Sequence, residues 1–143
     1  MKIRAYRGAD EAAVVALWQD CDLVRPWNDP RKDIARKLTV QPELFLVGEL
    51  EGKIVATVMA GYDGHRGWVN YLAVAPAHRR RGLGRALMDR AEALLKDMGC
   101  PKLNMQIRST NAAVAAFYER LGYAQDATIS LGKRLIPDGP VPT

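Results

Sequence analysis

The stretch Arg79-Arg80-Arg81-Gly82-Leu83-Gly84 joins an apolar segment that stops at Pro76 to a second segment with helical periodicity. A proline ends a strand because its ring nitrogen has no hydrogen to donate to the sheet. From Leu83 onward, apolar residues recur at helical spacing until Gly99, and glycine is common just after a helix. The sequence here predicts a strand, a basic turn and a helix in succession.

The turn places positive charge and glycine at the start of the predicted helix. The first N–H groups of a helix have no intrahelical partner, and they lie at the positive end of its dipole. Because Gly82 and Gly84 have no Cβ, phosphate oxygens can approach the backbone closely. A run of arginines is often only a solvated face, but beside two glycines at a helix start it predicts a bound phosphate. The counter-charge comes from Arg79, Arg80, Arg81 and Arg85.

Two other phosphate-binding motifs do not fit this turn. A P-loop requires a glycine followed by Lys-Ser or Lys-Thr, and the sequence has no such combination at the required spacing. A dinucleotide fingerprint requires a third glycine, but Leu87 stands in its place. It also requires an acidic residue about 20 residues later, and Pro101 to Leu103 contain none.

The rest of the chain alternates between short apolar runs and helical patterns. Leu44–Leu50 and Ile54–Ala60 flank the glycine turn Glu51–Lys53, which predicts an antiparallel hairpin. We expect a mixed α/β domain over residues 1–136, followed by a disordered tail over 137–143. The expected order is β-α-α-β-β-β-α-β-α-β. Its other members are a strand at Ile3–Tyr6, helices from Asp10 and Asp29, a strand at Trp68–Ala75, a helix from Leu83, a strand at Lys102–Ile107, a helix at Asn111–Leu121 and a strand at Tyr123–Leu135.

Composition limits the classes of protein to which the chain can belong. With 143 residues, 48% of them hydrophobic and 26% charged, it suits one globular domain. It has no apolar run of roughly 20 residues and no leader pattern at its start, so we expect no membrane association and a cytoplasmic location. Cys21 and Cys100 match no disulfide framework or zinc spacing, so we expect no metal site. The net charge of +5 attracts polyanions, but the arginines gather at one helix start, so we expect no nucleic-acid partner.

Two spaced motifs carry a resemblance to a known family. Residues 72–87, a strand followed by Val74-Ala75-Pro76 and the arginine-glycine turn, resemble the acetyl-CoA signature of the GNAT acetyltransferases. Asn111 and the later run Phe117-Tyr118-Glu119-Arg120-Leu121-Gly122-Tyr123 resemble the second signature of that family. The blocks Cys21–Pro30 and Gly61–Gly67 further resemble small bacterial GNAT proteins called YpeA-like.

The resemblance implies a fold and a reaction. The fold is a mixed, mostly antiparallel sheet flanked by helices, and acetyl-CoA is the cosubstrate. The acetyl group passes to a primary amine by direct attack, without a covalent enzyme intermediate. An acyl-CoA-binding sensor or interaction module on the same fold is the alternative. The acceptor is a small-molecule or peptide amine; polyamines, amino acids, antibiotics, and protein N-termini or lysines remain open, and a homodimer is compatible with the family.

The resemblance also assigns roles to residues. Tyr118 would donate a proton to the leaving thiolate; the alternative is a core aromatic next to Phe117. Asn111 would bind the pantetheine arm, and it also suits a helix cap. The strand Leu72-Ala73-Val74 would pair its backbone with pantetheine, and the N–H of Ala73 or Val74 would face the thioester oxygen.

The general base and the acceptor site are less clear. Many relatives have a glutamate just before this strand, where the chain has Asn70 and Tyr71. Candidate bases therefore come from loops, and each has an ordinary role as a helix cap or turn residue. A tryptophan in a loop of turn residues suggests a binding wall, because loops on rigid scaffolds carry specificity. The candidate bases are Asp29, Asp63 and His65, and the candidate wall residues are Trp27 and Asn28.

Overall fold

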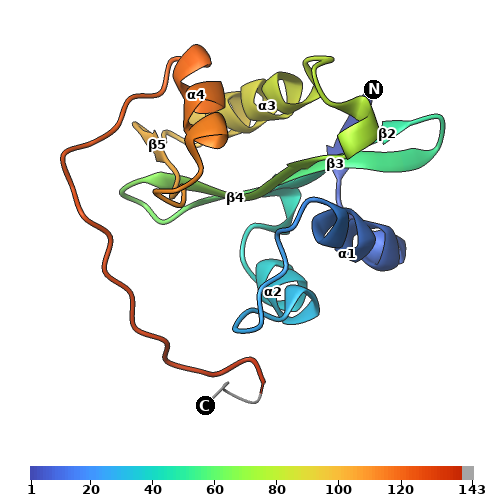
Figure 1. Ribbon diagram of the computed structural model, residues 1–143, viewed down its shortest axis with the longest axis horizontal. Coiled ribbons are helices and arrows are strands. Elements are labelled where there is room, and N and C mark those ends of the chain that lie inside the picture. The colour runs from blue at the N-terminus through green and yellow to red at the C-terminus, as the bar shows by residue number, and fades with distance from the viewer. Residues whose placement is uncertain (140–143) are drawn as a thin grey trace.

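The computed structural model describes residues 1–139, with a five-stranded sheet between two pairs of helices (Figure 1). The sheet order is β1-β2-β3-β4-β5, antiparallel except for the parallel β4–β5 pair. This confirms the predicted mixed, mostly antiparallel α/β class. The strands are β1 (Lys2–Ala5), β2 (Phe45–Leu50), β3 (Lys53–Tyr62), β4 (Gly67–Val74) and β5 (Leu103–Asn104), and the helices are α1 (Glu11–Asp20), α2 (Pro30–Lys37), α3 (Leu83–Asp97) and α4 (Ala112–Arg120).

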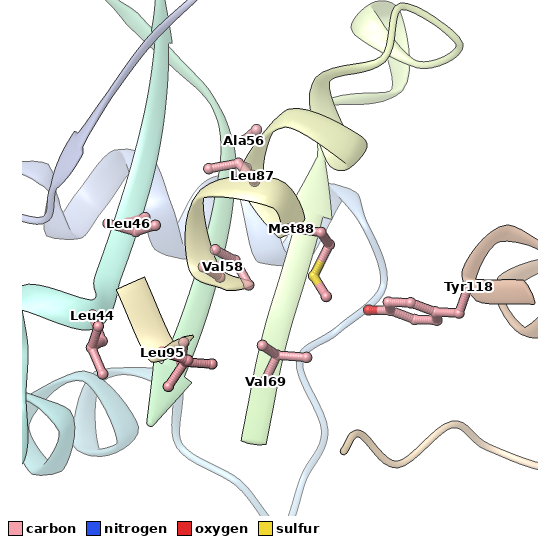
Figure 2. Packing of buried hydrophobic residues seen from close by; sticks show 11 residues of the cluster. Leu44, Leu46, Ala56, Val58, Val69, Leu87, Met88, Leu95 and Tyr118 are labelled. Atoms are coloured by element: carbon pink, nitrogen blue, oxygen red, sulfur yellow. The ribbon is translucent and has the colours of Figure 1, made fainter. Parts of the chain in front are cut away.

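Helices cover both faces of the sheet, so its central strands are buried on both sides. Successive side chains of a strand point to opposite faces, and each face has its own apolar cluster. Phe45 and Val47 of β2 pack with Trp18 in the cluster on the α1 and α2 side. Leu46 of β2 packs with Leu87 of α3 in the cluster on the other side (Figure 2). The two clusters hold the three layers together.

A β-bulge interrupts the pairing of β3 with β4. Thr57 lies opposite Ala73 and Met59 lies opposite Asn70, so two residues of β4 face the one residue between Thr57 and Met59. Such a bulge bends its strand and increases the local twist. Tyr71, within the bulge, has a φ of 51°, which is uncommon for a residue with a side chain.

Contacts from Trp18 and Thr57 hold the bulge in place. The indole Nε1 of Trp18 donates a hydrogen bond to Thr57 Oγ1 over 2.9 Å, and Thr57 Oγ1 donates to the carbonyl oxygen of Tyr71 over 2.8 Å. The ring of Tyr71 also stacks on Trp18, with centroids 3.8 Å apart. The bulge is therefore fixed to α1 as well as to β3.

The pairing of β4 with β5 covers only two residue pairs, Gly67 with Leu103 and Trp68 with Asn104. Beyond Trp68 the two segments separate, and within residues 1–139 no strand pairs with this edge of β4. The predicted strand Lys102–Ile107 is thus correct only over Leu103–Asn104, because the following residues diverge from β4. The sheet forks at this point.

The predicted strand Tyr123–Leu135 does not form. The segment after α4 joins no ladder in the described part of the chain, since β5 ends too early to offer it an edge. Side-chain hydrogen bonds hold the segment near β5, from Lys102 and Asn104 to Asp126 and from Gln106 to Ser130. Its apolar side chains remain exposed, Ile129 to 86% and Leu131 to 87%.

Asp138, in the stretch for which disorder is expected, contacts the start of α2. The chain crosses from α4 to α2 (Figure 1), and the Asp138 carboxylate accepts a hydrogen bond from the backbone N–H of Asp29 over 2.8 Å. Asp138 also forms an ion pair with Arg36. These contacts place Asp138 beside α2. The disorder expected for residues 137–143 stays a prediction, and residues 140–143 lie outside the described residues. No helix among residues 1–139 has the length and apolarity to cross a bilayer.

Replacing Thr57 with valine tests the support of the bulge. Thr57→Val keeps the shape of the side chain but leaves the Trp18 N–H and the Tyr71 carbonyl without this partner. We expect it to lower the free energy of unfolding by about 3 kcal/mol, because each buried polar group left unsatisfied costs about 1–3 kcal/mol. Urea unfolding measures the change. Thr57→Ser, which keeps the hydroxyl, should lose only about 1 kcal/mol for the missing methyl group; equal losses in the two variants would contradict this account.

Candidate active site

A cleft of about 770 Å³ opens where β4 and β5 diverge. One wall comes from the α1–α2 loop and α2, the floor from β3 and β4, and the other wall from residues 105–108 and α4. The fork therefore becomes a channel between the two helical layers. The polar residues that line it are Asp22, Arg25, Asn28, Asp33, Arg36, Lys37, Asn70, Tyr71, Gln106, Arg108, Asn111 and Tyr118.

Tyr118 reaches into this cleft from α4. Its side chain is 7% exposed and packs edge-to-face on Phe117 and Tyr123. Its hydroxyl oxygen is directed from α4 toward β4 (Figure 2), and it has no hydrogen-bond partner in the described chain. Burial raises the pKa of Tyr118 to about 12, because ionisation of the phenol would place a charge in apolar surroundings. The group is thus a buried, protonated donor free to bind a ligand.

The arginine-glycine turn leads directly into α3. Gly82 is the N-cap of the helix and has a φ of 76°, a conformation that glycine adopts without strain. Within residues 1–139, none of the four arginines of the turn has a carboxylate oxygen within 4.0 Å. Free N–H groups and unpaired guanidinium groups suit an anionic ligand.

Gly84 brings the turn close to Tyr118. A Cβ at Gly84 would lie 3.1 Å from Cζ of Phe117, the residue before Tyr118. The first turn of α3 therefore packs directly against α4. Arg85 reinforces this contact with a hydrogen bond to the carbonyl of Arg120 over 3.4 Å. The arginine-glycine turn and the buried phenol therefore belong to neighbouring, packed helices.

The strand Leu72-Ala73-Val74 lies at the fork. Leu72 lines the cleft, whereas Ala73 points to the opposite cluster, next to α1. The carbonyl of Val74 accepts a hydrogen bond from Nε of Arg79 over 3.2 Å, which ties the strand to the basic turn. Asn111 also lines the cleft, and its side chain caps α4 by accepting from the N–H of Val114 over 3.3 Å. Asn111 can therefore cap α4 and still contact a ligand in the cleft.

The loop candidates from the sequence do not all reach the cleft. Asn28 lines the cleft. Trp27 is 46% exposed, and Cζ of Arg108 lies over its ring, 5.5 Å from the ring centroid. Asp29 caps α2 by accepting from the N–H of Arg31 over 2.9 Å. Asp63 accepts from two N–H groups of its own turn, over 2.8 Å from His65 and 2.7 Å from Arg66. Neither Asp29, Asp63 nor His65 is among the lining residues.

Sequence reasoning missed the charged face of α2. Asp33, Arg36 and Lys37 all line the cleft, and they recur at the three- and four-residue spacing of one helical face. That spacing is visible in the sequence, but a charged helical face usually lies in solvent, so it does not by itself predict a site. Asp33 accepts a hydrogen bond from the Tyr71 hydroxyl over 2.5 Å and one from Arg36 over 3.2 Å. The bulge residue Tyr71 thus connects the sheet to α2.

No three His, Cys, Asp or Glu side chains gather into a metal-binding group in the part of the chain that the structure describes. The groups that line the cleft include a phenol and several charged side chains, beside the open backbone edge of β4. These groups suit the transfer of an acyl group from an anionic carrier.

Comparison with known proteins likewise indicates the transfer of an acyl group. A sequence model described as the Acetyltransferase (GNAT) family matches residues 12–123. Curated relatives named acetyltransferase are 54% identical over 138 residues in Yersinia enterocolitica and 52% identical over 139 residues in Sodalis glossinidius. Each match covers 96% of this chain and 98% of the relative.

Solved structures agree on the fold. The ribosomal-protein-S18-alanine N-acetyltransferase of Escherichia coli has a TM-score of 0.72 and 26% identity, over 88% of this chain and 79% of that one. An aminoglycoside antibiotic 6'-N-acetyltransferase of Acinetobacter haemolyticus has a TM-score of 0.75 at 17% identity, over 95% of this chain and 99% of that one, which shows a likeness of fold alone. The chain belongs to the GNAT acetyltransferase family and is an N-acetyltransferase.

Proposed function

We propose that the enzyme takes its acetyl group from acetyl-CoA and transfers it to a primary amine by direct attack. The observation that carries the proposal is that one cleft combines the Tyr118 phenol with the unpaired edge of β4, beside the arginine-glycine turn. A donor bound along this edge would have its phosphates at the turn and its thioester near Tyr118. The acceptor would enter from the side of α2.

The residues of the turn fit a pyrophosphate. The N-terminal N–H groups of α3 and the unpaired arginines would bind it. The missing Cβ of Gly82 leaves the backbone open there, whereas the missing Cβ of Gly84 lets α3 pack against Phe117. The free edge of β4 at Leu72–Val74 would hydrogen-bond the amides of pantetheine, with Asn111 on the opposite side. Acetyl-CoA supplies the acetyl group as a reactive thioester.

Tyr118 is the proposed general acid. As the amine nitrogen forms its bond to the carbonyl carbon, the carbon–sulfur bond breaks and the Tyr118 hydroxyl donates its proton to the departing thiolate. A backbone N–H of Ala73 or Val74 would stabilise negative charge on the carbonyl oxygen. Burial raises the pKa of the phenol, and it raises the proton affinity of a buried thiolate for the same reason, so proton transfer remains feasible.

No carboxylate in the cleft is well placed to remove a proton from the amine. Asp33 already accepts hydrogen bonds from the Tyr71 hydroxyl and from Arg36, so both of its oxygens have partners within the protein. Asp22 forms an ion pair with Arg25 over 3.3 Å. We therefore infer that the acceptor reacts from its neutral fraction, and that the proton leaves through water.

Tyr118→Phe tests the general acid. We expect kcat to fall at least about 100-fold, because the thiolate loses its proton donor. The dissociation constant of acetyl-CoA should stay unchanged, since the variant keeps the ring and its packing. Thiol release from acetyl-CoA in the presence of an amine panel measures turnover, and calorimetry measures binding.

The matched control is Tyr123→Phe, because the Tyr123 hydroxyl donates to Glu92 over 2.8 Å and does not line the cleft. It should keep nearly full activity. Full activity in Tyr118→Phe would refute the proposed acid, and a wild-type protein that fails to bind acetyl-CoA would refute the proposed donor.

The pH profile tests how the amine loses its proton. If the neutral fraction of the acceptor reacts, kcat/KM rises with pH until the pKa of that amine. Tyr118 should not limit activity below pH 11, because its raised pKa of about 12 keeps the phenol protonated there. Two acceptors with different amine pKa values should give breaks that move with the amine. A break at one pH for both acceptors would instead indicate a base on the enzyme.

A further inference from the structure

Lys37 is a buried cation in the cleft. It is the last residue of α2, is only 9% exposed and lines the cleft that also holds Tyr118. Its ammonium group lies against β3, because a Cβ at Gly61 would be 3.4 Å from Nζ. A lysine is rarely buried to this degree without a partner.

The ammonium group has no such partner in residues 1–139. No carboxylate oxygen lies within 4.0 Å of Nζ, and Nζ donates no hydrogen bond. The nearby Oε1 of Gln41 already accepts from the N–H of Tyr62 over 2.8 Å. Burial lowers the pKa of Lys37, and the more distant charge of Glu43 only opposes this shift. Nζ is nevertheless not among the fully buried polar atoms of the described chain that lack a partner, so the ammonium group remains open to the cleft and can bind an anion there.

Two of the other three cations that line the cleft pair with its carboxylates. Arg25 pairs with Asp22 over 3.3 Å, and Arg36 pairs with Asp33 over 3.2 Å. Arg108 lies over the ring of Trp27 and has no carboxylate within 4.0 Å in the described chain. Lys37 and Arg108 thus leave the cleft with excess positive charge.

We propose that the acceptor is an amine that carries its own anionic group, a carboxylate or a phosphate, and that Lys37 binds this group. This inference rests on the proposed acetyl transfer to an amine in the same cleft. The amine would lie toward Tyr118 and β4, and the anion toward α2 and β3. Polyamines and polycationic antibiotics do not fit, because their charges would repel Lys37 and Arg108.

Matched acceptor pairs test the charge requirement. The pairs are 4-aminobutyrate with n-butylamine, and O-phosphoethanolamine with ethanolamine, which separate carboxylate from phosphate. We expect wild type to prefer the anionic member of one pair by kcat/KM. Lys37→Gln should raise KM for that member about 10- to 100-fold, as expected for a lost charge-assisted hydrogen bond, and leave KM for the neutral member unchanged.

Two further variants separate a change at this position from a general loss of positive charge. Lys37→Arg should recover part of the preference. Arg31→Gln removes one positive charge from the same helix outside the lining of the cleft, and it should leave both KM values unchanged. If Lys37→Gln and wild type show the same preference between paired acceptors, the inference is wrong.

Stability and binding give readouts that do not depend on turnover. Lys37→Met keeps the length of the chain and removes an unpaired charge, so it should raise the melting temperature; a structural lysine would give the opposite result. Calorimetry should show 4-aminobutyrate or O-phosphoethanolamine binding to wild type and not to Lys37→Met. No turnover with any amine would refute the proposed function, whereas binding that is absent in wild type or equal in the two proteins would refute the inference.

Discussion

The bulge at Tyr71 is the constraint on which the rest of the site depends. It places a residue with a φ of 51° in the middle of a strand, and such strain persists only where the surroundings fix it. The hydrogen bonds from Trp18 to Thr57 and from Thr57 to the Tyr71 carbonyl provide that fixation from α1 and β3. Because a bulge bends its strand, β4 can turn away from β5 after only two residue pairs. The open edge of β4 and the cleft both follow from this divergence.

Tyr71 also contacts α2, which forms the proposed acceptor side of the cleft. The ring of Tyr71 packs on Trp18 in the core, and its hydroxyl ends at Asp33 of α2. Asp33 in turn holds Arg36, and Arg36 pairs with Asp138 from the far end of the chain. A rigid sheet feature is thereby linked to a helix whose own apolar contacts are few, since α2 has eight residues. The open edge of β4 and the charged face of α2 are consequently both connected to one strained residue.

Much of this architecture was predictable from the sequence, because it depends on local signals. The arginine-glycine turn, the α3 stripe, the hairpin and the Asn111–Tyr118 block have short-range patterns that packing does not override. The extent of β5 and the missing last strand were not predictable, since both depend on where β5 separates from β4, and no local pattern marks Tyr71 as a bulge. The contacts of Asp138 illustrate the same limit, because its partners Asp29 and Arg36 are about a hundred residues away in the sequence. For Asp29 and Asp63, by contrast, local roles suggested by the sequence are the ones that the structure shows. Asp29 caps α2, and Asp63 accepts hydrogen bonds within its own turn.

The distribution of unpaired charge explains the basic composition of the chain. Most acidic groups near the cleft already have cationic partners, whereas the arginines of the turn and Lys37 do not. Uncompensated charge weakens the folded state, and the cost is greatest for Lys37 because it is buried. These cations lie on separate elements, the arginines on the turn before α3 and around its start, and Lys37 at the end of α2. If an anionic acetyl donor binds at the arginine-glycine turn and an anionic acceptor binds at Lys37, the two ligands would balance part of the net charge of +5.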